Sequence, residues 1–337
     1  MDPITQGALG AALPLSISKR PKLLMTAWLG CLAGMSPDID VLIRSPTDPI
    51  LFLEYHRQFT HSLIFIPIGA LICTLLAYRW TRSEMAFKES YLVCFLGYGT
   101  HALLDACTSY GTLLAWPFSY VRIAWNNVSV FDPMVTVPLL LLIFIAVNKS
   151  KPLYAKWGML WVFTYLSFGV FQNQRAESFA LSLADARGHQ PDAITAKPGL
   201  GSLLLWKSIY EWQGYYYVDG VRTGFEVQSL QGDYIKKLDA EIDLPWLKQG
   251  SQQAKDLDRF SWFSQGYLAI DKENPLLIID MRYSMLPNEI KSMWGIQFDP
   301  EAESSKHVQF LSTRDVSEKR ISIFKQMLSG SYTGENN

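Results

Sequence analysis

Acidic and histidine side chains gather in three short motifs within the first third of the chain. These are Pro-Asp-Ile-Asp at 37–40, His-Arg-Gln-Phe-Thr-His-Ser at 56–62 and His-Ala-Leu-Leu-Asp at 101–105, and they hold three of the five histidines. Neutral imidazole and carboxylate are ligands that zinc, manganese and iron use in hydrolytic centres. The motifs therefore indicate a site for a divalent metal ion.

The spacing within the motifs fits shared ligation. If 101–105 is helical, its i, i+4 spacing puts His101 and Asp105 on one face. In an irregular segment, Asp38 and Asp40 can direct both carboxylates at one ion or bridge two.

Each motif also has a simpler explanation. The two aspartates could form a polar helix end, His101 could be a packed histidine hydrogen-bonded to Asp105, and Arg57 could be an interfacial anchor or a carboxylate partner. Because all the motifs converge on one side of the predicted domain, we favour the metal site.

The elements that carry these motifs belong to an apolar half of the chain. Of 337 residues 49% are hydrophobic and 18% are charged, and residues 1–174 hold 21 of the 61 charged side chains. Soluble domains carry about 25% charged residues, so the first half resembles a membrane protein. The net charge of −1 argues against a nucleic-acid binder. The four cysteines, all in this half, form no Cys-x-x-Cys pair, which argues against a zinc ribbon.

Six stretches of this half lack any Asp, Glu, Lys or Arg. They are 3–18, 23–37, 62–78, 90–104, 133–148 and 157–174. With interfacial residues added at each end, most of them approach the ~20 residues that cross a bilayer. The pattern predicts a multi-pass α-helical membrane domain of about six helices over 1–174.

The charges of the loops predict the orientation of these helices. The linkers 19–22, 79–88 and 149–156 hold nine of the twelve basic residues in this half. Since basic loops stay in the cytoplasm, the three motifs and everything after 174 are expected on the outer side of the membrane.

Residues 175–337 resemble a soluble domain. Runs at 203–210, 215–218, 276–283 and 293–298 are rich in aromatic and β-branched residues and are separated by Gly, Asp and Pro. They predict strands of a small antiparallel sheet in a mostly β, α+β domain. No motif in this half indicates its role.

The motifs resemble those of the YdjM/YbcI family of bacterial inner-membrane proteins, described as metal-dependent hydrolases. The resemblance also includes Met-Asp-Pro-Ile-Thr at 1–5, and it covers about residues 1–175. It implies a metal-site group of Asp38, Asp40, His56, His61, His101 and Asp105. Members often have His where this chain has Gln6, a poor zinc ligand, so the site either lacks one ligand or uses Asp2 instead.

We expect a metal-dependent hydrolase of the bacterial inner membrane, with its C-terminal domain periplasmic. The expected ligands of one or two ions (zinc, manganese or iron) are Asp38, Asp40, His56, His101 and Asp105. His61 would be a further ligand or the general acid or base, and Arg57 would bind a phosphate. The location and Arg57 together suggest a phosphoester of a membrane lipid or lipid-linked substrate.

Two other classes stay open. One is a metal-free lipid phosphatase with a histidine nucleophile, which a His-x3-Asp pair could support. The other is a transporter, or a scaffold that presents the C-terminal domain to a protein partner.

Overall fold

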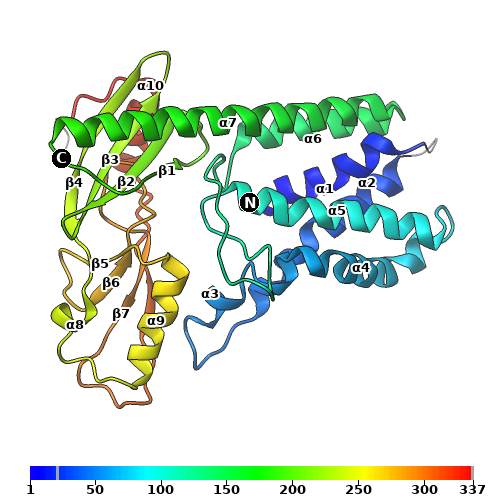
Figure 1. Ribbon diagram of the computed structural model, residues 1–337. Coiled ribbons are helices and arrows are strands. Elements are labelled where there is room, and N and C mark those ends of the chain that lie inside the picture. Colours follow the sequence, from blue (N-terminus) through cyan, green and yellow to red (C-terminus); the bar gives the residue numbers. More distant parts are fainter. Residues whose placement is uncertain (20–22, 335–337) are drawn as a thin grey trace. The chain divides into compact units, whose positions relative to one another are not determined.

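The computed structural model describes residues 1–19 and 23–334, which fall into two compact units (Figure 1). The first unit comprises Met1–Leu42, Tyr55–Phe171 and Leu200–Ser202, and the second comprises Ile43–Glu54, Gln172–Gly199 and Leu203–Asn337. The division differs from a single boundary after residue 174, because Ile43–Glu54 belongs to the second unit.

The first unit is helical. Its helices are α1 (Pro3–Ile17), α2 (Leu24–Met35), α4 (Ile66–Thr81), α5 (Phe87–Cys107) and α6 (Pro133–Asn148), with the 3-10 turns η1 (Ser36–Leu42), η2 (Phe59–His61) and η3 (Leu63–Phe65). The long helix α7 (Pro152–Ala186) begins in this unit. The six predicted apolar stretches fall on α1, α2, α4, α5, α6 and α7, so a helical N-terminal part is confirmed.

Helix α7 continues past the predicted end of the last apolar stretch, at residue 174. Residues 175–186 carry charges but are rich in Ala, Leu and other good helix formers. The predicted stretch ends at residue 174 because Arg175 is the next charged residue, but the helix continues because the following residues have high helix propensity.

One helix among the described residues, Leu63–Thr81, is long and apolar enough to cross a membrane, and Pro133–Asn148 is a shorter apolar helix. Helix α5 has the length but carries Lys88, Glu89 and Asp105. Six membrane-spanning helices therefore stay a prediction. In the first basic linker, Arg20 and Lys22 lie outside the described residues.

Glycines let α1, α2 and α5 approach each other closely. A Cβ atom on Gly97 of α5 would lie 2.6 Å from the carbonyl oxygen of Gly30, and one on Gly34 would lie 2.7 Å from the carbonyl oxygen of Gln6. Such distances exclude any side chain at these positions. Small residues at helix interfaces are typical of helices that pack in a membrane, and here they bring the end of α2 against α5.

The described residues of the second unit form two antiparallel four-stranded sheets. The first consists of β1 (Ile194–Pro198), β2 (Leu205–Trp212), β3 (Tyr215–Thr223) and β4 (Val227–Lys236), and the second of β5 (Leu268–Ile270), β6 (Leu277–Asp280), β7 (Trp294–Gln297) and β8 (Gln309–Ser312). Helices α3 (Leu51–Tyr55), α8 (Ala240–Asp243), α9 (Gln252–Ser264) and α10 (Glu318–Ser329) complete the list. A β-sheet region after the helical part is confirmed, although it forms two sheets and not one.

The segment Ile43–Glu54 is attached to the second unit through Arg259 of α9. The Arg259 guanidinium donates to both oxygens of Asp48, at 3.1 and 2.8 Å, and its Nε donates to Glu54 at 2.6 Å. The ring of Phe52 packs edge-on against Phe310, with 5.1 Å between centroids. Along the chain, this segment lies between Asp40 of the first motif and His56 of the second.

We predict that Arg259→Met releases this segment. The variant loses a bidentate ion pair and a second carboxylate partner, both largely shielded from water, so we expect a loss of about 1–3 kcal/mol in the free energy of local opening. Hydrogen exchange of residues 43–54 in the full chain should speed up accordingly. Lys306→Met, which removes the exposed pair with Asp299, is the matched control and should change little. Unchanged exchange in Arg259→Met would contradict the assignment.

Candidate metal centre

The first motif begins where α2 ends. Pro37 has no backbone N–H to continue the helix, and the Ser36 hydroxyl donates to the carbonyl of Ala33 at 2.8 Å. The chain then tightens into the 3-10 turn η1. With three residues per turn, Asp38 and Asp40 point in directions about 120° apart, and the two carboxylates reach opposite nitrogens of His61, Asp38 at Nε2 and Asp40 at Nδ1.

The second motif contains a backbone strain at Arg57, whose φ is +64°. This left-handed conformation is uncommon for a residue with a side chain and costs on the order of 1–3 kcal/mol. It is held by a hydrogen bond from Arg57 N to Asp40 Oδ2, at 3.0 Å, and by one from Leu113 N to the Arg57 carbonyl, at 3.0 Å. The turn directs the side chains of His56 and His61 to different positions.

The third motif lies in the last two turns of α5. His101 and Asp105 share one face, as their spacing predicts, with 3.7 Å between His101 Nε2 and Asp105 Oδ2. Both side chains are fully buried.

Four side chains from the three motifs meet at one point. His61 Nε2 lies 2.9 Å from His101 Nε2, 3.5 Å from Asp38 Oδ1 and 3.3 Å from Asp105 Oδ2, and His101 Nε2 lies 3.4 Å from Asp38 Oδ1. A tetrahedral ion with ligand bonds of about 2.0–2.1 Å has ligand-to-ligand edges of about 3.4 Å. The donor set and its spacing therefore fit a zinc-like ion, and we call Asp38, His61, His101 and Asp105 the four-residue group.

The hydrogen bonds on the far sides of the two imidazoles support this assignment. His101 Nδ1 faces the Gly34 carbonyl at 2.6 Å, and His61 Nδ1 lies 3.0 Å from the Thr60 hydroxyl and 3.2 Å from Asp40 Oδ2. The Thr60 hydroxyl donates its own proton to Asp40 Oδ2 at 2.7 Å. Both Nδ1 atoms therefore face acceptors and carry a proton, and in the neutral rings each Nε2 is left with a lone pair. Two lone pairs directed at each other require a cation, and such outer contacts commonly fix the tautomer of metal-binding histidines.

The charges of the cluster are unbalanced without a further cation. The carboxylates of Asp38, Asp40 and Asp105 face two positive groups, the guanidinium of Arg57 and the N-terminal ammonium of Met1, and both of these pair with Asp105. Asp105 Oδ2 is buried without a hydrogen bond, although Arg57 Nε lies 2.9 Å away as an ion pair. Burial lowers the pKa of His61, but the carboxylates of Asp105, Asp38 and Asp40 outweigh it and raise this pKa to about 10. In the absence of metal, a proton on His61 supplies the missing positive charge.

Asp40 and His56 form a second layer beside the four-residue group. Asp40 accepts from His56 Nδ1 at 2.8 Å and from the Thr60 hydroxyl at 2.7 Å, in addition to Arg57 N. Burial would raise the pKa of Asp40, but its hydrogen bonds with His56 and His61 hold it well below its usual range. The spacing of Asp38, Asp40 and His56 would also permit a second ion, with Asp38 shared between the two.

Arg57 lies inside the cluster. Its side chain is 5% exposed, its Nη1 donates to the Thr108 hydroxyl at 2.9 Å, and its guanidinium lies 5.0 Å from the ring centre of Tyr110. The Arg57 side chain, which we expected to bind a phosphate, is therefore already bound to Asp105 and Thr108 and packed on Tyr110.

Gln6 and Asp2 both lie outside the two groups that could hold a metal. Gln6 Nε2 donates to Asp105 Oδ1 at 2.8 Å, so this side chain orients a candidate ligand. Asp2 caps α1 by accepting from Thr5 N and from the Thr5 hydroxyl. Sequence reasoning missed Thr60 and the Gly34 carbonyl. Thr60 lies inside the second motif, but no side-chain pattern could indicate a backbone carbonyl.

Comparison with known proteins gives a family match to the first half of the chain. Residues 1–176 match the family model described as YdjM inner membrane protein. Over 133 residues the chain is 29% identical to inner membrane protein YbcI of Escherichia coli (strain K12), an alignment that covers 39% of this chain and 71% of that protein. No solved structure matches. All three motifs lie within the matched residues.

We predict that His61→Ala and His101→Ala each abolish metal retention, because each removes one of two facing nitrogens. His56→Ala should keep the ion of the four-residue group. Elemental analysis of protein purified in mild detergent without chelators gives the metal content, and elution volume checks folding. Full occupancy in His101→Ala would contradict the site, and loss of one of two ions in His56→Ala would establish the second position.

We also predict that zinc affinity rises with pH. Zinc must displace the proton that His61 holds up to a pKa of about 10, so the apparent Kd should fall about tenfold per pH unit between pH 6 and 8. Titration calorimetry in buffers of different ionisation enthalpy should show about one proton released per ion. An affinity independent of pH would show that His61 is not displaced from a protonated state.

Proposed function

Because the chain belongs to the YdjM family of inner membrane proteins, we propose that it is a membrane-embedded, metal-dependent hydrolase of lipid-like phosphoesters. The convergence of Asp38, His61, His101 and Asp105 on one point is the observation that carries the proposal. Zinc is the ion we favour, with manganese or iron as alternatives that use the same donors.

A divalent ion bound by these residues would lower the pKa of a water ligand to about 7 and so supply a nucleophile at neutral pH. Hydrolysis needs a position for this water. Four protein ligands close a structural zinc site, so at the four-residue group the water would have to bind as a fifth ligand. Asp38 is the most exposed member of the group, with 22% of its side chain accessible. We place substrate entry on its side.

His56 is the residue we propose as general base and acid. Its ring is partly exposed, and its Nδ1 is bound to Asp40 Oδ1 at 2.8 Å, which leaves Nε2 for proton transfer. A carboxylate that orients an imidazole in this way is a recurrent arrangement in hydrolases. His61 directs its Nε2 into the four-residue group and is better suited to bind the ion. The proposed roles of His56 and His61 are therefore exchanged relative to the sequence-based expectation.

We propose Arg57 as a positioning residue. Its ion pair with Asp105 and its hydrogen bond to Thr108 fix the carboxylate and offset part of its charge. In the proposed reaction, water oxygen forms a new P–O bond while the P–O bond to the leaving alcohol breaks. His56 accepts the proton of the water and returns one to the leaving oxygen.

The proposal also includes the location of the site. Basic residues concentrate in linkers 19–22, 79–88 and 149–156, which supports a multi-pass protein with the metal site and the second unit on the outer side of the membrane. A lipid or lipid-linked phosphoester at that surface would then reach the site laterally.

The test is hydrolysis of p-nitrophenyl phosphate and of phosphatidic acid in nanodiscs by metal-loaded protein. His56→Asn can keep a hydrogen bond to Asp40, because its amide nitrogen takes the place of Nδ1, but it cannot carry the proton. We therefore expect kcat to fall about 10²–10⁴-fold while metal content stays unchanged. His61→Ala should lose both activity and metal.

Two results would contradict the proposal. Hydrolysis that persists after the metal is removed would favour a metal-free histidine phosphatase. A metal-loaded protein inactive on both esters would remove support for phosphoester hydrolysis.

A further inference from the structure

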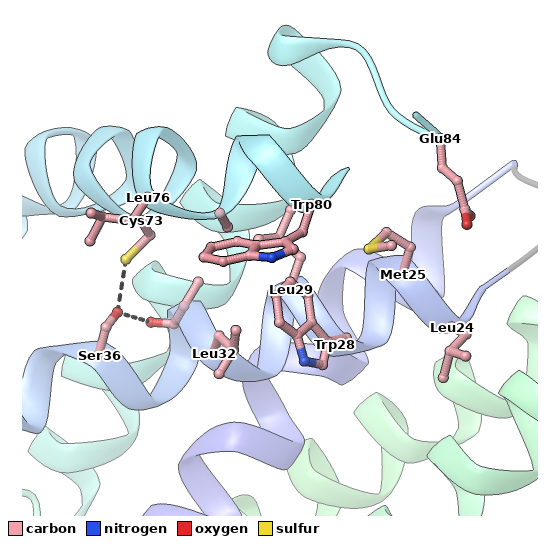
Figure 2. A pocket seen from close by; sticks show the side chains of 12 residues that line it. Leu24, Met25, Trp28, Leu29, Leu32, Ser36, Cys73, Leu76, Trp80 and Glu84 are labelled. Carbon is pink, nitrogen blue, oxygen red and sulfur yellow. Dashed lines mark hydrogen bonds between the residues drawn. The ribbon is translucent and has the colours of Figure 1, made fainter. Parts of the chain in front are cut away.

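An apolar groove runs between α2 and α4 in the helical unit (Figure 2). Its volume is about 910 Å³, within the range of small-molecule sites. The lining residues used below are Leu29, Leu32 and Ala33 of α2, Ser36 after it, and Cys73 and Leu76 of α4.

One end of the groove adjoins the metal-site motifs. Ala33 and Ser36 line it, and Gly34, which lies between them, accepts the hydrogen bond from His101 Nδ1. Asp38 follows Ser36 by two residues. At the end of α2, Ala33 and Ser36 therefore line the groove, whereas Gly34 contacts His101 of the four-residue group.

The walls of the groove suit a hydrocarbon chain. The Ser36 hydroxyl is already bonded to the Ala33 carbonyl and lies 3.0 Å from Cys73 Sγ, as the dashed lines in Figure 2 show. Among the described residues that line the groove, the charged one is Glu84, at the end away from Ser36 (Figure 2). A charged head group would find no partner along most of its length, whereas methylene groups would lose contact with water.

The groove also opens onto a surface that fits lipid. Its wall α4 belongs to Leu63–Thr81, the helix apolar enough to cross a membrane. Exposed Leu71, Ile72 and Leu75 lie on this helix beside the lining residues, so the groove is continuous with an apolar face. From Leu24 to Ser36 it follows α2 for about 18 Å, slightly more than one leaflet of a hydrocarbon core of about 30 Å.

We propose that this groove binds one hydrocarbon chain of a membrane lipid whose phosphoester head lies at Asp38. The inference rests on the proposed function, since it specifies the substrate of the same site. It explains how a site at a helix end could select a lipid: the chain is held between α2 and α4, and the head group is left beside the part-exposed carboxylate.

The test compares two neighbouring leucines of α4. Leu76 lines the groove and Leu75 does not, and both are largely exposed. Leu76→Trp should lower kcat/KM for long-chain phosphatidic acid about tenfold, which corresponds to lost burial of about two methylene groups, and should leave p-nitrophenyl phosphate hydrolysis unchanged. Leu75→Trp is the control and should alter neither. Leu32→Trp, from the opposite wall, repeats the test if Leu76→Trp does not fold.

A binding measurement separates this proposal from the hydrolase proposal. Phosphatidic acid with a diazirine in its acyl chain is photo-crosslinked to the protein in nanodiscs, and the adducts are mapped by mass spectrometry. We expect adducts concentrated on Leu29, Leu32 and Leu76 and reduced in Leu76→Trp. If the adducts concentrate on these residues but no hydrolysis is measured, the lipid site is supported and the proposed hydrolase activity is overturned. Adducts spread evenly over the apolar faces of α4 and α6, or equal effects of both tryptophan variants, would overturn the groove.

Discussion

Two imidazole nitrogens, Nε2 of His61 and Nε2 of His101, lie 2.9 Å apart in the buried centre of the helical unit. The acceptors on their other sides, the Asp40 carboxylate and the Gly34 carbonyl, hold the protons away from this contact. The pair is stable only with a positive charge between or on the rings. A proton on His61 can supply it, but a divalent ion supplies more charge and also satisfies Asp38 and Asp105. This requirement for a cation connects the fold to the proposed chemistry.

The packing of the helices makes the contact possible. The Gly34 carbonyl reaches His101 because α1, α2 and α5 approach each other at glycines that leave no space for a side chain. Pro37 then ends α2 and delivers Asp38 to the same point. On the other side of the turn, the strained backbone at Arg57 separates His56 from His61. Packing, helix termination and local strain therefore each place one part of the donor set.

Sequence reasoning was most informative where one rigid element carries both partners. The i, i+4 pair of His101 and Asp105 lies on one helical face because a helix leaves no alternative, and the apolar stretches fall on helices for the same reason. It could not distinguish the directions of His56 and His61, since these depend on the left-handed Arg57. It also missed the segment Ile43–Glu54, whose attachment depends on Arg259 more than 200 residues later in the chain. Contacts between distant parts of the chain leave no local pattern.

X-ray absorption at the metal edge tests the central claim most directly. For the purified protein loaded with one equivalent of zinc, we expect a first shell of nitrogen and oxygen at about 2.0–2.1 Å, with the outer-shell scattering of two imidazoles. The four-residue group offers no sulfur, so no zinc–sulfur distance near 2.3 Å should be present. A spectrum with six water-like oxygens and no imidazole scattering, or one with sulfur ligands, would contradict the assignment of this centre.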